Sequence, residues 1–307
     1  MLTRDNLNGV WVSAPAVWDT HGQFDEKRFR ANIRAYADAK LHGVWIAGSS
    51  GEFQSLEWDE FQRITTAFVE EVNGRTLTIV GCSAVNTADA IRRTRFAQAA
   101  GADGVLNALP FFVALRSDES FQYFADLADA CPNIGIAHYN TLRAGVYLSA
   151  KEYLRLSEIP NFVGSKQVGS DWMHFMELVR LTPMLAHMPV DGLFVPAMMI
   201  GGRGVWSAVA MWNPAFMLGA YRLAEQKQWT AALQHQFQIN AFLSEVAVPL
   251  VAQGFLDPVV DKAMCNITCF TDAGDPRQPF LPMSPQWKDW ARERIERNHH
   301  WLLEGKA

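Results

Sequence analysis

Lys166 ends a short apolar run, Asn161–Lys166, and is the side chain of this sequence with the most evident reactivity. A lysine ammonium group is rarely buried without a partner, because removing it from water costs free energy. The same desolvation disfavours the charged form, so a lysine held among apolar neighbours becomes a usable amine nucleophile. The alternative is a lysine at a strand end whose ammonium group reaches solvent. The other lysines lie in polar, helix-like or terminal surroundings: Lys27, Lys40, Lys151, Lys227, Lys262, Lys288 and Lys306.

Two further motifs could serve a lysine of this kind. The turn Gly48–Glu52 offers the hydroxyls of Ser49 and Ser50 and backbone N–H groups up to Gly51, which together could hold a small carboxylate or phosphate. The phenol of Tyr139 could exchange protons with the amine or with an adduct formed on it. Each motif by itself also fits an ordinary role, as a plain turn or as a tyrosine at the edge of the core. Together with the lysine they point to Schiff-base chemistry on a 2-oxo acid.

The elements that must position these residues alternate along the chain. Short β-rich runs, most of them apolar on both faces as in a buried parallel sheet, are separated by segments with apolar residues at helical spacing. About eight such repeats predict an α/β protein, a (β/α)8 TIM barrel, in which chemistry takes place at the C-terminal ends of the strands. The predicted strands are Gly9–Ala14, Gly43–Ala47, Thr76–Cys82, Gly104–Leu109, Ile134–Tyr139, Phe162–Lys166, Met184–Met188 and Gly204–Ala208.

Helix signals complete the predicted architecture. Segments 229–252, 258–269 and 285–303 are typical of three helices appended to the barrel. We therefore expect a catalytic barrel over residues 1–228 and a C-terminal helical extension over residues 229–307 that packs on it, without a linker between separately folding domains. Ser149–Glu152 matches a capping box, and Ser117 and Ser170 are candidate N-caps.

The composition narrows the class of protein. With 307 residues, 49% of them hydrophobic, and a net charge of -5, the chain is typical of a soluble globular protein. The mild acidity argues against a nucleic acid or a membrane surface as a partner. Four scattered cysteines indicate a reducing compartment, so we expect the cytoplasm. Cys265 and Cys269 lie one helical turn apart, but no second pair has zinc spacing, so core thiols and no metal are expected. Neither a signal peptide nor a membrane-spanning apolar stretch is found.

The order and spacing of the motifs resemble those of the dihydrodipicolinate synthase / N-acetylneuraminate lyase family of pyruvate-dependent class I aldolases. The matching landmarks are Gly48–Glu52, Tyr139-Asn140, Gly164–Lys166, Gly201–Ser207 and Phe280–Pro285. The resemblance implies that Lys166 is the Schiff-base lysine, that Tyr139 is the proton shuttle, and that no cofactor is needed. It also implies that Ser49, Ser50 and the adjacent amides, including Gly51, hold the carboxylate of pyruvate. Glu52 fits the motif as a residue that orients the turn.

Several positions depart from the family pattern. The synthases place a tyrosine after the fourth strand, whereas Leu109–Phe112 has no hydroxyl there. Trp206 stands where those synthases carry a small aliphatic residue near the pyruvate, and Ala16-Val17 replaces a Thr-Pro pair. These changes predict a substrate pocket that is apolar and aromatic, in which Phe112 and Trp206 contact a flat hydrophobic partner. Arg143 instead resembles an arginine that binds a second carboxylate in the synthases, or it pairs with a helix end.

Other stretches are most similar to the branch of hydratase-aldolases that cleaves aromatic ylidene-pyruvates. These stretches are Trp58–Glu60, Asn86–Arg95 and Phe124–Asp129. We therefore expect a hydratase-aldolase that cleaves or forms a carbon–carbon bond between pyruvate and an aromatic aldehyde, with Tyr139 assisting the addition of water to an unsaturated substrate. As in most relatives, a homotetramer is expected.

Other functions remain open at this stage. A sugar-acid aldolase or dehydratase, or a condensing enzyme like dihydrodipicolinate synthase, is favoured if Arg143 binds a polar substrate tail. A phosphate-binding barrel enzyme could use Gly201–Gly204, although no further phosphate or metal signature accompanies that stretch. A non-catalytic sensor of 2-oxo acids would keep the Gly48–Glu52 turn but would need no lysine nucleophile.

Overall fold

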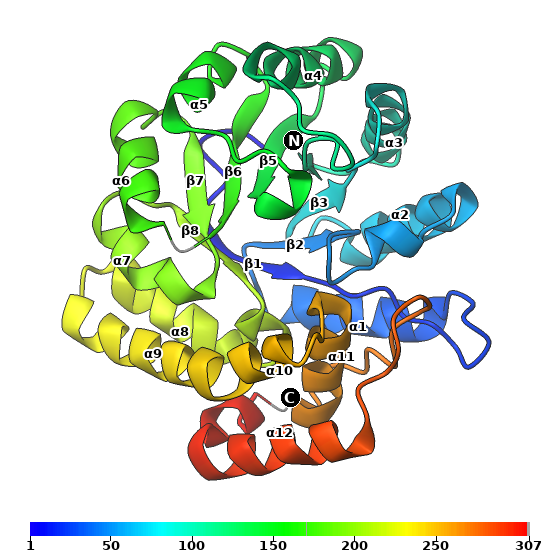
Figure 1. The fold of residues 1–307 in the computed structure, drawn as a ribbon, viewed down its shortest axis with the longest axis vertical. Coiled ribbons are helices and arrows are strands. Elements are labelled where there is room, and N and C mark those ends of the chain that lie inside the picture. Colours follow the sequence, from blue (N-terminus) through cyan, green and yellow to red (C-terminus); the bar gives the residue numbers. More distant parts are fainter. Residues whose placement is uncertain (170, 306–307) are drawn as a thin grey trace. The chain divides into compact units, whose positions relative to one another are not determined.

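The computed structural model describes residues 1–169 and 171–305 and confirms the predicted fold class. Over these residues the chain forms an eight-stranded sheet with the strand order β7-β6-β5-β4-β3-β2-β1-β8, and helices alternate with the strands as in a (β/α)8 barrel. Helices also follow the last strand, as predicted (Figure 1). The chain divides into two compact units, Met1–Gly9 with Leu77–Trp206 and Val10–Thr76 with Ser207–Ala307, and each is described by itself.

The first unit carries strands β3 to β8 and the helices between them. Strands β4 to β7 pair in parallel with their neighbours, and nearly every residue in them is buried, as the continuous apolar runs predict. Its elements are β3 Leu77–Gly81, α3 Thr87–Ala99, β4 Gly104–Asn107, α4 Ser117–Ala130, β5 Gly135–Thr141, α5 Ala150–Leu156, β6 Phe162–Val168, α6 Trp172–Leu181, β7 Ala186–Pro189, α7 Phe194–Met199 and β8 Gly204–Ser207, whose last residue belongs to the second unit.

Gly164 decides how closely β6 and β7 approach. A Cβ at this position would lie 2.1 Å from the carbonyl oxygen of Ala186, its partner in the ladder. Any larger residue would therefore push the two strands apart. An isolated parallel bridge between Val190 and Trp206 continues the pairing from the end of β7 to β8. Strand β6, which carries Lys166, is thus held tightly on its β7 side.

The second unit carries the first two strands and the C-terminal helices. Strand β1 pairs in parallel with β2, and the predicted apolar face of α1, including Phe29 and Ile33, is buried. Its elements are β1 Gly9–Ser13, whose first residue belongs to the first unit, α1 Glu26–Asp38, β2 Gly43–Ile46, α2 Trp58–Val72, α8 Pro214–Glu225, α9 Trp229–Phe242, α10 Val248–Ala252, α11 Asp257–Thr268 and α12 Pro285–Asn298.

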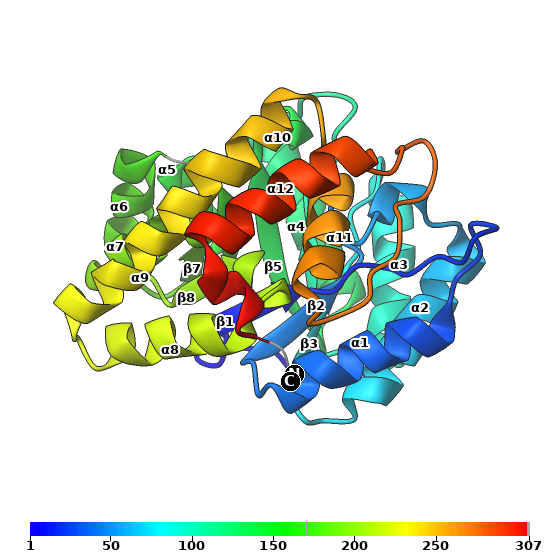
Figure 2. The ribbon, with the colours of Figure 1, turned by 90° about the horizontal axis from the view of Figure 1, so that it is seen from below.

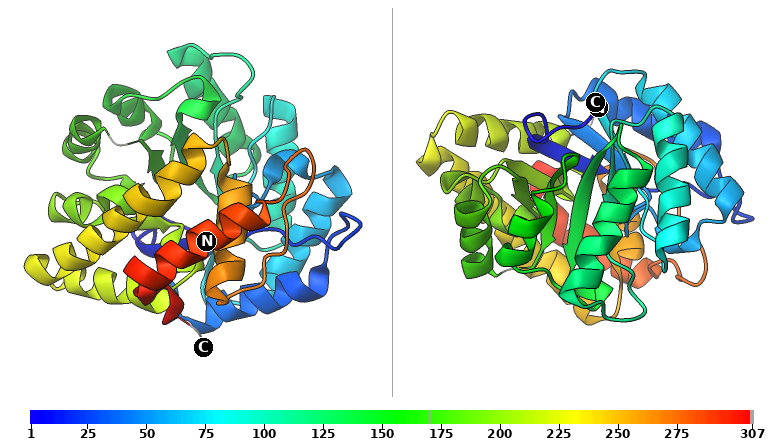
Figure 3. Two further views of the ribbon diagram at one scale, coloured as in Figure 1. Left: turned by 60° about the horizontal axis from the view of Figure 1, so that its bottom comes forward. Right: turned by 90° about the horizontal axis from the view of Figure 1, so that it is seen from above.

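The three predicted C-terminal helices are present. A π-helical turn, Leu243–Ala247, joins α9 to α10, so residues 229–252 form one continuous helical run. Helix α12 runs alongside this segment and over α11 (Figures 2 and 3). The chain end returns to α8, where the Trp301 ring stacks on Phe216 with ring centroids 4.0 Å apart. The division into a catalytic barrel over residues 1–228 and a C-terminal helical extension over residues 229–307 stays a prediction. In the described part of the chain, no helix is both long and apolar enough to cross a membrane.

The predicted helix caps are partly correct. Glu152 accepts a hydrogen bond from the backbone N–H of Ser149 at 2.8 Å, which confirms the capping box at α5. The prediction for Ser117 is wrong, because this residue is already the first of α4. The cap is Arg116, whose N–H donates to Glu119 at 2.8 Å. Ser170 lies outside the described residues.

Candidate active site

Lys166 and Tyr139 are neighbours on adjacent strands of the first unit. The ladder between β5 and β6 pairs the two residues in register, and the Lys166 Nζ lies 4.5 Å from the centroid of the Tyr139 ring. Both residues are buried, each with 8% of its surface exposed. An ammonium group over an aromatic face is attracted by the ring quadrupole, which supports this pairing. The structure therefore brings together the two side chains that were predicted to do chemistry.

The loops at the same ends of the strands carry two other predicted residues. Phe112 lies in the loop between β4 and α4 and is 89% exposed. Arg143 is exposed in a short 3-10 helix directly after β5, and its backbone N–H donates to the hydroxyl of Thr141 at 3.4 Å. Trp206 is buried in β8.

The Gly48–Glu52 turn lies in the second unit, directly after β2. The Glu52 N–H donates to the carbonyl of Ser49 at 3.2 Å, and Glu52 itself takes a left-handed backbone conformation with φ of 53°. Gly51 is required, because a Cβ there would lie 2.8 Å from the backbone nitrogen of Ala47. These features make a tight turn directly after β2. Successive backbone N–H groups in a turn of this kind can form a concave site for an anion.

The hydroxyl of Ser50 already has a strong acceptor. Its Oγ donates to Asp261 Oδ2 of α11 at 2.5 Å, and both residues are buried. A serine hydroxyl has one proton to donate. The Ser50 proton is therefore committed to Asp261.

Glu52 is the anchor of the turn. Its Oε1 accepts from Trp18 Nε1 at 2.8 Å and forms an ion pair with Lys262 Nζ at 2.5 Å, while its Oε2 accepts from the backbone N–H of Arg277 at 2.7 Å. Glu52 and Lys262 are fully buried. Breaking a buried pair by removing one partner typically costs about 3–5 kcal/mol, because the other charge is left uncompensated. The contacts agree with the interpretation that Glu52 orients the turn.

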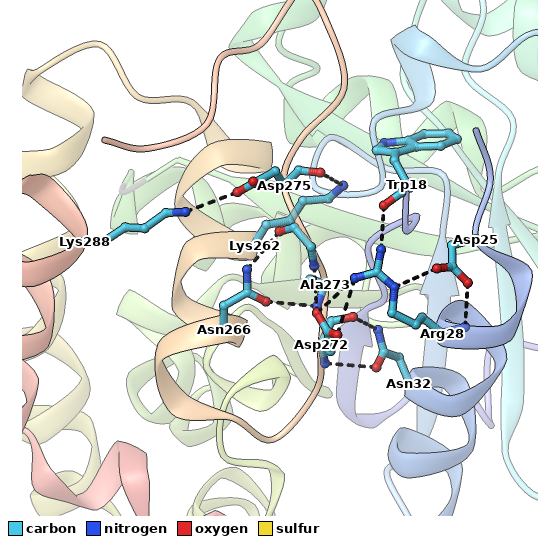
Figure 4. A network of polar contacts seen from close by, with 11 residues as sticks. Trp18, Asp25, Arg28, Asn32, Lys262, Asn266, Asp272, Ala273, Asp275 and Lys288 are labelled. Atoms are coloured by element: carbon cyan, nitrogen blue, oxygen red, sulfur yellow. Dashed lines mark hydrogen bonds and ion pairs between the residues drawn. The ribbon is translucent and has the colours of Figure 1, made fainter. Parts of the chain in front are cut away.

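The C-terminal segment that supplies these contacts is itself tied to α1. Arg28 donates to the carbonyl oxygen of Trp18 at 2.7 Å and pairs with Asp272 at 3.4 Å, and Asn32 donates to the carbonyl of Asp272 at 2.7 Å. On the other side, Asn266 donates to the carbonyl of Gly274 at 2.9 Å (Figure 4). The segment is therefore held in place before it reaches Glu52.

Lys262 lies in a helix, as the sequence indicates, but its burial is not evident from the sequence. None of its surface is exposed, against 8% for Lys166. Burial lowers the pKa of Lys262, and the Glu52 carboxylate opposes that shift. The Nζ also donates to the carbonyl of Asp275 at 3.2 Å (Figure 4). A lysine held by a carboxylate keeps its proton, so burial alone does not make Lys262 a nucleophile.

The cysteines are only partly as predicted. Cys265 is buried, and burial raises its pKa to about 12, but Cys269 is exposed at the end of α11. Cys269 is therefore not a core thiol. Over residues 1–169 and 171–305, no group of three or more His, Cys, Asp or Glu side chains is placed to hold a metal ion.

Comparisons with known proteins cover nearly the whole chain. The model of the family described as dihydrodipicolinate synthetase matches residues 6–297. A 4-hydroxy-tetrahydrodipicolinate synthase from Methanosphaerula palustris is 30% identical over 244 residues, which is 78% of this chain and 80% of that protein. A trans-o-hydroxybenzylidenepyruvate hydratase-aldolase from Pseudomonas aeruginosa is 28% identical over 225 residues, 70% of this chain and 67% of that protein.

Solved structures share the fold. The prophage protein YagE of Escherichia coli K12, a member of the dihydrodipicolinic acid synthase family solved with pyruvate, superposes with a TM-score of 0.87 at 19% identity, covering 95% of this chain and 99% of that one. The dihydrodipicolinate synthase of Aquifex aeolicus gives a TM-score of 0.86 at 23% identity, covering 98% and 100%. At these identities the likeness supports the barrel fold and nothing finer.

Proposed function

We infer the reaction class from family membership: the chain belongs to the dihydrodipicolinate synthetase family. This is a family of pyruvate-dependent class I aldolases, lyases and synthases. We propose that in this chain Lys166 forms a Schiff base with a 2-oxo acid and that Tyr139 moves the protons. The observation that carries the proposal is the register-matched pair itself, with the Lys166 amine over the Tyr139 ring.

The proposed reaction follows from the chemistry of an imine. The Lys166 amine adds to the ketone carbon of the 2-oxo acid, and loss of water gives a protonated imine. Tyr139 removes the proton of the hydroxyl on the fourth carbon, and the bond between the third and fourth carbons breaks. The electron pair of that carbon–carbon bond moves into the protonated imine, which releases an aldehyde and leaves an enamine of pyruvate on Lys166. Protonation of the enamine and hydrolysis return pyruvate and the free lysine; condensation is the reverse.

The Gly48–Glu52 turn is our proposed site for the substrate carboxylate. The Ser49 hydroxyl and the backbone N–H groups of Ser50 and Gly51 are the donors we assign to it. Ser50 takes part through its backbone, because its hydroxyl proton is held by Asp261. We therefore expect substitution of Ser50 by alanine to remove its hydrogen bond to Asp261 and not a side-chain donor to the substrate carboxylate.

The experiment that tests the proposal is reductive trapping. Borohydride with pyruvate should add one reduced pyruvyl group to the protein, and peptide mass mapping should place it on Lys166. Lys262 is the internal control, because it is more buried but is paired with Glu52. An adduct on Lys262 or on a surface lysine, or no adduct, would refute the assignment.

For the substrate class we propose an aromatic aldehyde, in a hydratase-aldolase reaction. One relative carries that name, trans-o-hydroxybenzylidenepyruvate hydratase-aldolase. In addition, Leu109–Phe112 has no hydroxyl where the synthases place a tyrosine, and Trp206 is aromatic where they carry a small aliphatic residue. A condensing activity like that of the 4-hydroxy-tetrahydrodipicolinate synthases is the second candidate. The observation that favours it is Arg143, an exposed cation in the loop directly after Tyr139 and its strand.

Substitution of Trp206 separates the two candidates. We expect Trp206→Ala to reduce the preference for aryl aldehydes over glyceraldehyde by about 1–3 kcal/mol, the scale of one large apolar contact. The measurement is the ratio of kcat/KM for the two aldehydes, which does not depend on how much enzyme is folded. A native enzyme that prefers aspartate semialdehyde, glyceraldehyde or N-acetylmannosamine would contradict the aromatic proposal and would identify Arg143 as the selecting residue.

We also propose a homotetramer that works in the cytoplasm. The adjacent residues Phe112 and Val113 are exposed at 89% and 59%, which supports association, because contiguous exposed apolar surface commonly marks an interface. We expect Phe112→Ala to shift the protein toward smaller species in light scattering while trapping at Lys166 is retained. Leu281→Ala is the control, because Leu281 is likewise an exposed apolar residue, with 75% of its surface exposed. A native monomer with full activity would overturn the assembly proposal.

A further inference from the structure

A buried polar network lies behind the Tyr139–Lys166 pair, on the other face of the same two strands. Successive side chains of a strand point to opposite faces, so the residues next to the pair share that other face. In the ladder between β5 and β6, Asn140 is paired with Gln167, one position after Tyr139 and Lys166. Asn140 and Gln167 expose 0% and 2% of their surface. Neither has a part in the reaction proposed above, although burying two amides is costly unless they are hydrogen-bonded.

Gln167 is the centre of this network. Its Nε2 donates to the Tyr153 hydroxyl of α5 at 3.0 Å and to the Ser165 hydroxyl at 2.6 Å. Its Oε1 accepts from Asn140 Nδ2 at 2.9 Å and from the Tyr147 hydroxyl at 3.2 Å. One side-chain amide thus joins β6 to β5, to helix α5 and to the loop after β5.

The hydrogen bonds beyond Ser165 have one direction. Both amide protons of Gln167 are donated, so Ser165 accepts from it and gives its own proton to His187 Nδ1 at 2.8 Å. Burial lowers the pKa of His187 to about 3, so its ring is neutral and carries its single proton on Nε2. That N–H donates to Thr182 Oγ1 at 2.8 Å, and Thr182 donates to the carbonyl of Leu178 at 2.7 Å. The hydrogen bonds at both ring nitrogens of His187 therefore agree on one tautomer, with the proton on Nε2.

The second branch ends at His138. Tyr153, which accepts from Gln167, shares a hydrogen bond of 2.6 Å with His138 Nδ1. Burial lowers the pKa of His138 to about 3, so this ring is also neutral. Among the described residues the buried His138 Nε2 has no hydrogen-bond partner. Both branches thus start from the same amide of Gln167.

Asn140 ties the loop after β5 to the same point. Its Oδ1 accepts from the backbone N–H of Leu148 at 3.0 Å, and its Nδ2 donates to the Leu148 carbonyl at 3.2 Å. Tyr147, the neighbour of Leu148, reaches Gln167 directly. The loop that carries Arg143 is therefore held at its far end by the Asn140–Gln167 amide pair.

The amide pair acts near the ends of the two strands. Gln167 lies one residue after Lys166 and one residue before the end of β6, where it is paired with Pro189 of β7. A displacement of about 1 Å at a reacting group can reduce a rate about a hundredfold.

We propose that Gln167, together with Asn140, is a positioning residue that holds Lys166 opposite Tyr139 and fixes the loop from Thr141 to Leu148. The kinetic consequence rests on the proposed Schiff-base function, whereas the geometric consequence does not. Gln167 has no contact with the reacting atoms; it acts through the ends of β5 and β6.

The first test compares Gln167→Met with Gln236→Met. Methionine has nearly the shape of glutamine but can replace none of its hydrogen bonds, and Gln236 of α9 is equally buried at 2% exposure. We expect Gln167→Met to slow borohydride trapping of pyruvate about ten- to a hundredfold per folded molecule, with KM changed much less than kcat. Gln236→Met should leave both unchanged. Because the amides act as a unit, Gln167→Met combined with Asn140→Leu should be little slower than the slower single variant.

The second test needs no activity. A crystal structure of the native protein should show Lys166 Nζ 4.5 Å from the centroid of the Tyr139 ring, and a crystal structure of Gln167→Met should show Nζ displaced from that position. In addition, ¹⁵N NMR of the native protein should find the His187 proton on Nε2. If Gln167→Met does not fold, Ser165→Ala removes one branch and takes its place. An unchanged trapping rate and an unchanged Lys166–Tyr139 distance in a folded variant overturn the proposal. If the native protein forms no pyruvate adduct, the proposed function fails, and the crystallographic distance alone decides whether Gln167 positions the pair.

Discussion

Lys166→Ala should remove adduct formation with pyruvate and lower turnover by roughly a thousandfold or more, because no other group can supply the imine. Lys166 is buried, but truncating one amine side chain at a strand end opens no large void, so the fold should persist, as circular dichroism and thermal unfolding would show. Lys166→Arg should be equally inactive, since a guanidinium keeps its charge and cannot form the imine. The measurements are mass spectrometry of the borohydride product and steady-state turnover.

The control for this prediction is Lys151→Ala, which removes an exposed lysine of α5. Its activity should equal that of the native protein. Substantial turnover in both Lys166 variants would show that the enzyme works without a Schiff base at this position. It would then favour the enzymatic alternatives that need no Schiff base, whereas a sensor that binds a 2-oxo acid without reacting would show no turnover even as the native protein.

Tyr139→Phe should reduce turnover by about a hundred- to ten-thousandfold, the usual contribution of general acid–base catalysis. The variant keeps the ring over which Lys166 Nζ lies and deletes only the hydroxyl. The substrate should still be bound, so the loss should fall on kcat more than on KM, and trapping at Lys166 should continue at a slower rate.

Tyr123→Phe is the matched control for the hydroxyl. Tyr123 is a buried tyrosine of α4 in the same unit, and its hydroxyl lies 3.4 Å from the carbonyl of Ala108. Deleting it should alter stability slightly and leave turnover unchanged. Near-normal turnover of Tyr139→Phe would assign Tyr139 to packing, and the proton transfers would then belong to another group.

The two buried lysines show why burial alone is a poor guide to reactivity. Lys262 is the more enclosed, but Glu52 compensates its charge at 2.5 Å and the pair anchors a turn. Lys166 instead lies against an aromatic face at the end of a strand. What distinguishes them is the partner, which only the packed structure reveals.

The sequence by itself determined the strands and their order. The predicted strands coincide with β1 to β8 to within about two residues at most ends, because a strand buried on both faces must be a continuous apolar run bounded by polar or glycine residues. The barrel rule then placed Lys166 and Tyr139 at C-terminal strand ends. A motif resemblance added their expected roles, and family membership agrees with the class of chemistry.

Tertiary structure decided which polar residues meet. Asn140 and Gln167 lie one residue beyond the predicted strands Ile134–Tyr139 and Phe162–Lys166, and only the register of β5 against β6 pairs them behind the reacting residues. Lys262 looked like an ordinary helical lysine, since the spacing of apolar residues cannot show that α11 is covered on all sides from Pro258 to Cys265. Periodicity reports one buried face of an element. The partners on the other faces come from segments distant in sequence, and packing alone selects them.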